Sequence, residues 1–129
     1  MAINSTYTQN GNTVAADGAR VKVGRLTLGA DSITAADFLQ QEVGFTPRYI
    51  KFTNLTDRIS VEWFEGMAAN TCLKTAAAGT QTLETTNGGI TVCDSNGDAT
   101  TTGRQFKVLQ NATLAVIAAS KVLTWVAYG

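Results

Sequence analysis

Apolar and polar residues alternate along much of the chain with a period of two, which is typical of half-buried β-strands. The first clear case covers residues 19–29, where basic and small residues separate the apolar ones. The alternating apolar positions there are Val21, Val23, Leu26 and Leu28. Gly24 interrupts this pattern and is a candidate β-bulge. The pattern therefore predicts a strand over 19–29 with a possible irregularity at its middle.

The strongest alternation covers residues 48–64 and predicts a β-hairpin. Pro47 precedes its first strand, 48–55, and the segment Thr56-Asp57-Arg58 predicts a tight turn before the return strand, 59–64. In the return strand Ile59, Val61 and Trp63 share one face. Trp63 is therefore expected in the core, and its neighbour Phe64 is expected to point away from it.

After Gly66 the apolar segments become short and are separated by turn signals such as Asn87-Gly88-Gly89 and Asn96-Gly97. Segment 31–43 is ambiguous, because a cap at Asp31 or Ser32 favours a short helix whereas 38–43 also suits a strand. The remaining predicted strands are 72–75, 80–85, 90–93, 105–109, 114–118 and 122–128. The fold class expected is all-β, a compact β-sandwich or jelly-roll-like barrel of about eight short antiparallel strands.

One domain is expected from the length of 129 residues. Residues 1–18 are polar and small, with turns at Asn10-Gly11 and Asp17-Gly18, and predict an N-terminal arm that either stays disordered or orders by lying on a neighbour. Residues 19–129 are predicted to form a single β-sandwich domain.

The charge content narrows the classes of partner. Charged residues make up 16% of the chain, and ten basic residues balance ten acidic ones, whereas an average protein carries ~25% charged residues. Without a basic cluster, no nucleic-acid partner is expected. The apolar run 114–119 is far shorter than the ~20 residues of a membrane helix, so no membrane partner is expected either. The start of the chain has no basic and apolar leader, which predicts synthesis in the cytoplasm.

Candidate chemistry is sparse, and we expect no enzyme activity. The chain has no histidine, which removes the commonest general base and the Ser-His-Asp and Cys-His types of site. Ser120-Lys121 is only an adjacent pair, and the carboxylates Asp57, Glu62 and Glu65 are interpreted as turn and strand-surface residues rather than a glycosidase pair.

No metal or other cofactor is expected. Cys72 and Cys93 lack the spacing of a metal site and are interpreted as small buried thiols, although a disulfide between them stays open. Residues 94–98 resemble the start of a calcium loop, but the glycine and the closing glutamate of the EF-hand pattern are missing from their positions. A polar hairpin turn is the simpler interpretation.

Three segments resemble small virion structural proteins of tailed bacteriophages. They are GFTPRYIKFTNLTDR at 44–58, VEWFEGM at 61–67 and, more loosely, VLTWVAYG at 122–129. The resemblance implies a head decoration (cement) protein that docks as a dimer or trimer on the lattice of the major capsid protein, at the surface of the virion head. The alternatives are a tail, collar or fibre-associated protein, or a carbohydrate-binding β-sandwich for host attachment.

The residues expected to contact a partner are aromatic and basic. The hairpin contributes four of them, and the final strand adds two aromatic side chains of the kind that interfaces favour. The full set of candidates is Arg48, Tyr49, Arg58, Phe64, Trp125 and Tyr128.

Overall fold

The structure is a computed structural model that describes residues 20–34 and 37–129. These residues form strands and loops, and no helix among them is long and apolar enough to cross a bilayer. The strands are β1 (Val21–Thr27), β2 (Phe38–Glu42), β3 (Tyr49–Asn54), β4 (Ile59–Phe64), β5 (Cys72–Thr75), β6 (Gln81–Glu84), β7 (Ile90–Cys93), β8 (Gln105–Leu109) and β9 (Val122–Tyr128).

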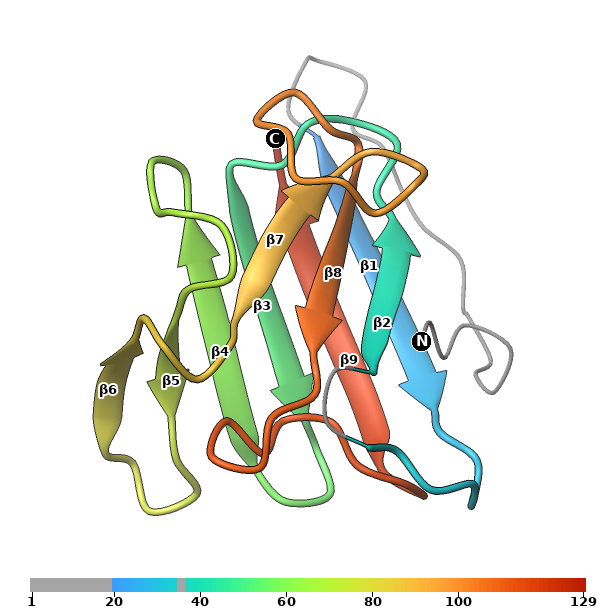
Figure 1. The fold of residues 1–129 in the computed structure, drawn as a ribbon, viewed down its shortest axis with the longest axis vertical. Coiled ribbons are helices and arrows are strands. Elements are labelled where there is room, and N and C mark those ends of the chain that lie inside the picture. The colour runs from blue at the N-terminus through green and yellow to red at the C-terminus, as the bar shows by residue number, and fades with distance from the viewer. Residues whose placement is uncertain (1–19, 35–36) are drawn as a thin grey trace.

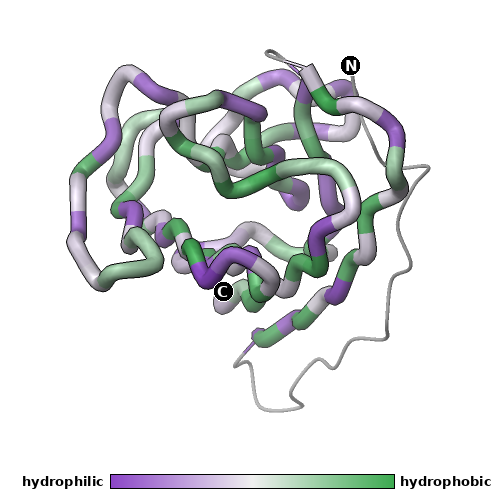
Figure 2. The backbone as a smooth tube through the Cα atoms, turned by 90° about the horizontal axis from the view of Figure 1, so that it is seen from below, coloured by the Kyte–Doolittle hydropathy of each residue, from purple (hydrophilic) through white to green (hydrophobic). Residues whose placement is uncertain are grey.

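The strands form two antiparallel sheets that pack face to face. The larger sheet has six strands in the order β1-β9-β3-β4-β5-β6, and the smaller has three in the order β2-β8-β7. The smaller sheet lies in front of the larger one in Figure 1, and the view from below shows the two layers (Figure 2). The all-β sandwich is confirmed, with nine strands in the described residues rather than about eight.

The core lies between the two sheets and is rich in aromatic residues. Phe106 of the smaller sheet makes edge-on contacts with Phe52 and Trp125 of the larger one, with ring centroids 6.3 and 5.0 Å apart. Trp63 is 8% exposed and belongs to this core, so the prediction for its face is confirmed. Cys72 and Cys93 are buried free thiols.

Gly24 is not a bulge. β1 pairs with β9 residue for residue from Val21 to Thr27, and Gly24 stands opposite Trp125. A Cβ atom at Gly24 would lie 2.3 Å from the indole Nε1 of Trp125. The glycine is needed because the tryptophan ring lies against its backbone.

Two other sequence predictions need correction or resolution. In the described part of 31–43 a strand forms at Phe38–Glu42, so the helix alternative is not realised. Segment 114–118 is not a strand, because Ala115 adopts a φ of 57° and both Val116 and Ile117 are buried, which breaks the alternation. Its apolar side chains join the core from a loop instead. The predicted arm, 1–18, lies outside the described residues.

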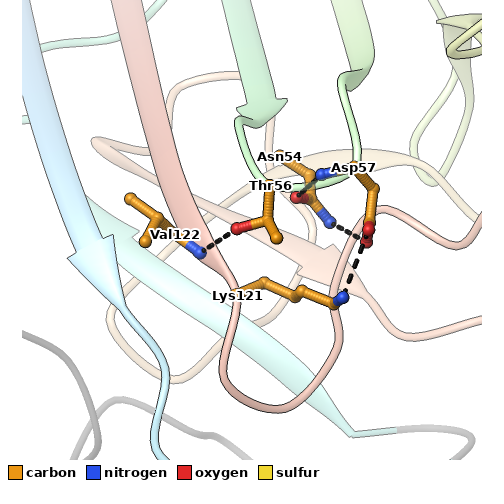
Figure 3. Close-up of polar contacts among 5 residues, drawn as sticks. All are labelled: Asn54, Thr56, Asp57, Lys121 and Val122. Carbon is orange, nitrogen blue, oxygen red and sulfur yellow. Dashed lines mark hydrogen bonds and ion pairs between the residues drawn. The ribbon is translucent and has the colours of Figure 1, made fainter.

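The β3–β4 turn is tied to the start of β9 by polar contacts (Figure 3). The buried Asn54 donates from its Nδ2 to Asp57 (3.0 Å) and accepts from the Asp57 backbone N–H (2.9 Å). Lys121 donates to the other carboxylate oxygen of Asp57 (3.1 Å), and the Val122 backbone N–H donates to Thr56 Oγ1 (3.0 Å). The turn is thereby fixed to the strand that pairs with β3.

Candidate protein-docking face

The outward side of the six-stranded sheet, called here the outer face, is composed of rows of residues that the strand register places side by side. The row nearest the C-terminus, called the aromatic row, consists of Val21, Tyr128, Tyr49 and Phe64, on β1, β9, β3 and β4. Because β9 lies between β1 and β3 (Figure 1), it brings a tyrosine from the end of the chain beside the hairpin.

The aromatic rings of this row touch one another, and the outer two remain open to solvent. The ring centroids of Tyr49 and Phe64 are 5.1 Å apart, and those of Tyr49 and Tyr128 are 5.8 Å apart. Phe64 and Tyr128 are 44% and 45% exposed. Neighbouring rings at these separations form a continuous apolar surface rather than isolated exposed side chains.

The central ring, Tyr49, is held in place by a charged hydrogen bond. Its hydroxyl donates to a carboxylate oxygen of Glu62 on β4. Burial of the phenol, and then the hydrogen bond and charge of Glu62, raise the pKa of Tyr49 above its usual range. The hydroxyl therefore stays protonated above the pH at which an ordinary tyrosine ionises, and its hydrogen bond keeps the ring oriented in the row.

A second row, called the middle row, crosses all six strands. It contains apolar residues on its outer strands and a Lys51–Glu62 pair on β3 and β4 at its centre, in the order Val23, Val126, Lys51, Glu62, Leu73 and Leu83. Of the five large apolar side chains that are exposed in the described residues, four are in these two rows: Val23, Phe64, Leu83 and Tyr128.

The third row, called the hydroxyl row, is polar. It consists of Arg25, Thr124, Thr53, Ser60, Thr75 and Gln81. The outer face thus changes along the strands from aromatic, through apolar residues around one charge pair, to hydroxyl and amide groups.

The contact candidates from the sequence fall into three groups. Tyr49, Phe64 and Tyr128 meet in the aromatic row, and Arg48 lies beside them, where its Nε is 3.2 Å from Glu65 Oε2. Arg58 is exposed in the β3–β4 turn, at the far end of the hairpin, with a φ of 60°. The structure brings the three aromatic residues together and leaves Arg58 apart.

Trp125 is a correction. The sequence suggested it as a contact residue, but it is 2% exposed and packs on Phe106 in the core. Strand alternation puts Trp125 on the opposite side of β9 from Tyr128. Of the two aromatic residues of β9 expected to contact a partner, only Tyr128 is exposed to do so.

Sequence reasoning missed the contribution of β1, β5 and β6 to this surface. Val23 and Leu83 are 46% and 62% exposed, yet each lies in a segment where alternation alone does not say which side faces the core. Leu83 stands out as an apolar residue among polar neighbours in Gln81–Glu84. The isolated leucine was the one sequence signal for an apolar residue on the outer face. It becomes informative only when Leu73 on β5 is known to pair with Leu83.

The residues weighed for catalysis are occupied elsewhere. Lys121 pairs with Asp57 in the turn network, Glu65 pairs with Arg48, and Glu62 binds Tyr49. In the segment 94–98, Asp94 accepts hydrogen bonds from the backbone N–H groups of Asn96 and Asp98, as in a polar turn. No cluster of metal-ligating side chains occurs in the part of the chain that the structure describes.

A cavity of about 300 Å³ lies at the side of the sandwich near the aromatic row. Its lining is mostly apolar and includes Trp63, Met67 and Val92, with Glu65 as its charged residue. Since Trp63 is 8% exposed, its ring offers little area for a sugar to stack upon. The cavity therefore does not supply the open aromatic platform that a carbohydrate site needs.

Comparison with known proteins gives no assignment: no family model, no curated protein and no solved structure matches this chain.

Proposed function

We propose that this protein is a non-enzymatic structural subunit of a tailed-bacteriophage particle, and specifically a capsid decoration protein that docks on the major capsid protein lattice. The single observation that carries the docking role is the outer face, where exposed aromatic and aliphatic residues from four strands lie in two adjoining rows. The phage particle is suggested by the resemblance of the segments 44–58, 61–67 and 122–129.

The outer face is more apolar than the solvent-facing side of a β-sandwich that stays monomeric. One face of an antiparallel sheet commonly packs on the core while the other carries polar residues toward water. Here Phe64, Tyr128 and Leu83 are exposed on the outer face instead. Large exposed apolar patches mark sites where another protein binds, so this face is suited to burial against a subunit.

A decoration protein needs no chemistry of its own to stabilise a shell. Because it binds the assembled lattice and not the separated subunits, its binding must be reversed before the shell opens, which stabilises the shell by mass action. Repeated weak contacts across a lattice add through multivalency. The low charge content of this chain suits contacts that depend on apolar burial rather than on salt bridges.

The test is a binding experiment with empty shells assembled from the major capsid protein of the same phage. We expect the purified protein to co-sediment with the shells at a stoichiometry close to that of the lattice and to raise their melting temperature in calorimetry. The matched variants are Phe64→Glu, on the outer face, and Leu55→Glu, an equally exposed apolar residue in the β3–β4 turn (44% and 48% exposed).

Phe64→Glu should abolish shell binding, while Leu55→Glu should keep it. Failure of the wild-type protein to bind the shells overturns the head assignment. Binding to tail or fibre-base components in the same assay would then support a tail, collar or fibre role, and a signal on a glycan array would support carbohydrate binding.

A further inference from the structure

We propose that the outer face is the interface of a twofold homodimer, with the axis running along the strands between β3 and β4. The inference rests on the proposed function and refines it: a second copy of this chain covers the outer face, and the resulting dimer, through its other surfaces, is the unit that docks on the shell. It rests on three features of the face: its self-complementary pattern, its charge pair and its size.

The middle row of the face matches itself, and in the aromatic row Tyr49 faces the position of Phe64. A twofold axis between β3 and β4 places each strand of one copy over its counterpart in the partner: β3 over β4, β9 over β5 and β1 over β6. In the middle row Val23 then faces the position of Leu83, and Val126 that of Leu73. In the hydroxyl row the same operation sets Thr53 against the position of Ser60 and Arg25 against that of Gln81.

The centre of the face is complementary in charge. Lys51 on β3 is exposed, and the structure gives it no ion-pair or hydrogen-bond partner among the described residues. Glu62 lies beside it on β4, with one carboxylate oxygen bound to Tyr49. Across the twofold axis the Lys51 ammonium of each copy meets the Glu62 carboxylate of the other, so the centre of the interface contains two symmetric ion pairs.

The size of the face is sufficient for a stable dimer. Six strands ~4.8 Å apart, and rows ~6.7 Å apart along them, define an area of roughly 600 Å² per copy before side-chain relief is added. Two copies would bury roughly 1,200 Å², which exceeds the ~1,000 Å² expected of a biological interface. Packed sheets cross at ~30°, which displaces the outer strands most and the Lys51–Glu62 pairs at the centre least.

The experiment is a charge swap followed by sedimentation equilibrium. In Lys51→Glu, the new carboxylate of each copy faces the Glu62 carboxylate of the other. In Glu62→Lys, the new ammonium group of each copy faces the Lys51 ammonium of the other. We expect a dimeric wild-type protein, and a Kd raised about tenfold or more in each single variant. An equimolar mixture of the two variants should form a heterodimer, because both ion pairs are restored between unlike chains.

The mixture is the decisive arm, since a variant that merely damages its own fold is not rescued by another. Circular dichroism and a thermal melt confirm folding of each variant, and Phe64→Glu supplies an independent route to the monomer. Arg104→Glu is the matched control, because this exposed arginine lies in the loop before β8 rather than on the outer face. It should leave the dimer unchanged.

A monomeric or trimeric wild-type protein overturns the inference, and so does a mixture that stays monomeric. Shell binding separates this result from the proposed function. A wild-type monomer that binds the shells means that a capsid subunit, and not a second copy, occupies the outer face. If the protein is a dimer with the expected charge-swap behaviour but does not bind the shells, the dimer interface is supported and the assignment to the head is overturned.

Discussion

The two ends of the β3–β4 hairpin differ in how their side chains are satisfied. At the turn end, Asn54 is fully buried and its amide binds Asp57, which in turn binds Lys121 (Figure 3). At the open end, Tyr49 and Phe64 form an exposed pair of rings, and their ion-pair neighbours Arg48 and Glu65 are mostly in solvent. One end is closed by its own chain, and the other presents apolar surface.

This difference divides the segment 44–67 into two parts with separate roles. The Asn-x-Thr-Asp-Arg part holds the turn against β9, so its role is explained within the fold. Tyr49 and Phe64 at the other end have no such explanation, since neither is buried in the core. A motif can thus combine residues kept for folding with residues available for binding, and substitutions can separate them.

The largest expected effect is at the turn end. Asn54→Ala removes the acceptor of the Asp57 backbone N–H and a donor to its carboxylate in a buried site, which should lower the free energy of unfolding by about 2–3 kcal/mol. Urea denaturation measures the change. Asn96→Ala, at an exposed asparagine in the 94–98 turn, is the control and should change stability by less than about 0.5 kcal/mol. Equal effects at both positions would contradict the assigned role of Asn54.

As the pH rises, ionisation of the buried thiols in the core should lower the free energy of unfolding before ionisation of Tyr49 at the open end does. Burial, and then the charge of Glu84, raise the pKa of Cys72 to about 12, and burial raises that of Cys93 to about 11, from an ordinary value near 9. Above pH 9 the unfolded chain therefore binds fewer protons than the folded one, so stability that is complete below pH 9 falls as the pH rises toward 12.

Urea titrations at pH 8 and pH 10 measure this loss, which should be roughly 2–3 kcal/mol for the two thiols together. Cys72→Ala should make the stability less dependent on pH in this window. Tyr49→Phe should change the pH dependence of stability only near pH 10 and above, where the phenol of the unfolded chain ionises. A stability that rises between pH 8 and pH 10 would show that the buried thiols do not govern this range.

Phe64→Glu should cost little stability despite its expected effect on docking. The side chain is 44% exposed, so the loss is mainly its contact with Tyr49, about 0.5–1 kcal/mol. Thermal or urea unfolding of the variant under conditions where the wild-type protein is monomeric gives the value. A loss as large as that of Asn54→Ala would mean that Phe64 serves the fold, and the contrast between the two ends would fail.

The smallest expected difference concerns the two ion pairs. Double-mutant cycles should give a coupling of about 0.5 kcal/mol for Lys121–Asp57 and near zero for Arg48–Glu65, because the first pair is less exposed (29% and 37%) than the second (73% and 65%). High salt should reduce the coupling at the turn end. A stronger Arg48–Glu65 coupling would reverse the comparison.

Much of the fold was predictable because strand signals are local. The hairpin, its turn and the opposite orientations of Trp63 and Phe64 follow from alternation and turn residues, and the structure agrees. The failures also have local causes. The segment 114–118 does not alternate, and its apolar residues fill the core from a loop. Gly24 is not a bulge but makes room for the ring of Trp125 opposite it, which no local pattern predicts.

The candidate site was predictable only in part, because it depends on pairing between distant segments. Tyr49 and Phe64 lie in one hairpin, so their proximity was implied by the turn. Tyr128 joins them through the β3–β9 pairing, and Val23 is added through the β1–β9 pairing. No local pattern specifies that the last strand inserts between the first and the third.

The sequence by itself determined the all-β class, most strand positions and the side of the hairpin that is buried, since these depend on residue type and a period of two. Only the tertiary structure decided the strand order, the burial of Trp125 and the gathering of apolar residues on the outer face. The physical reason is that alternation assigns residues to the two sides of a strand, whereas register between non-neighbouring strands determines which residues share a surface.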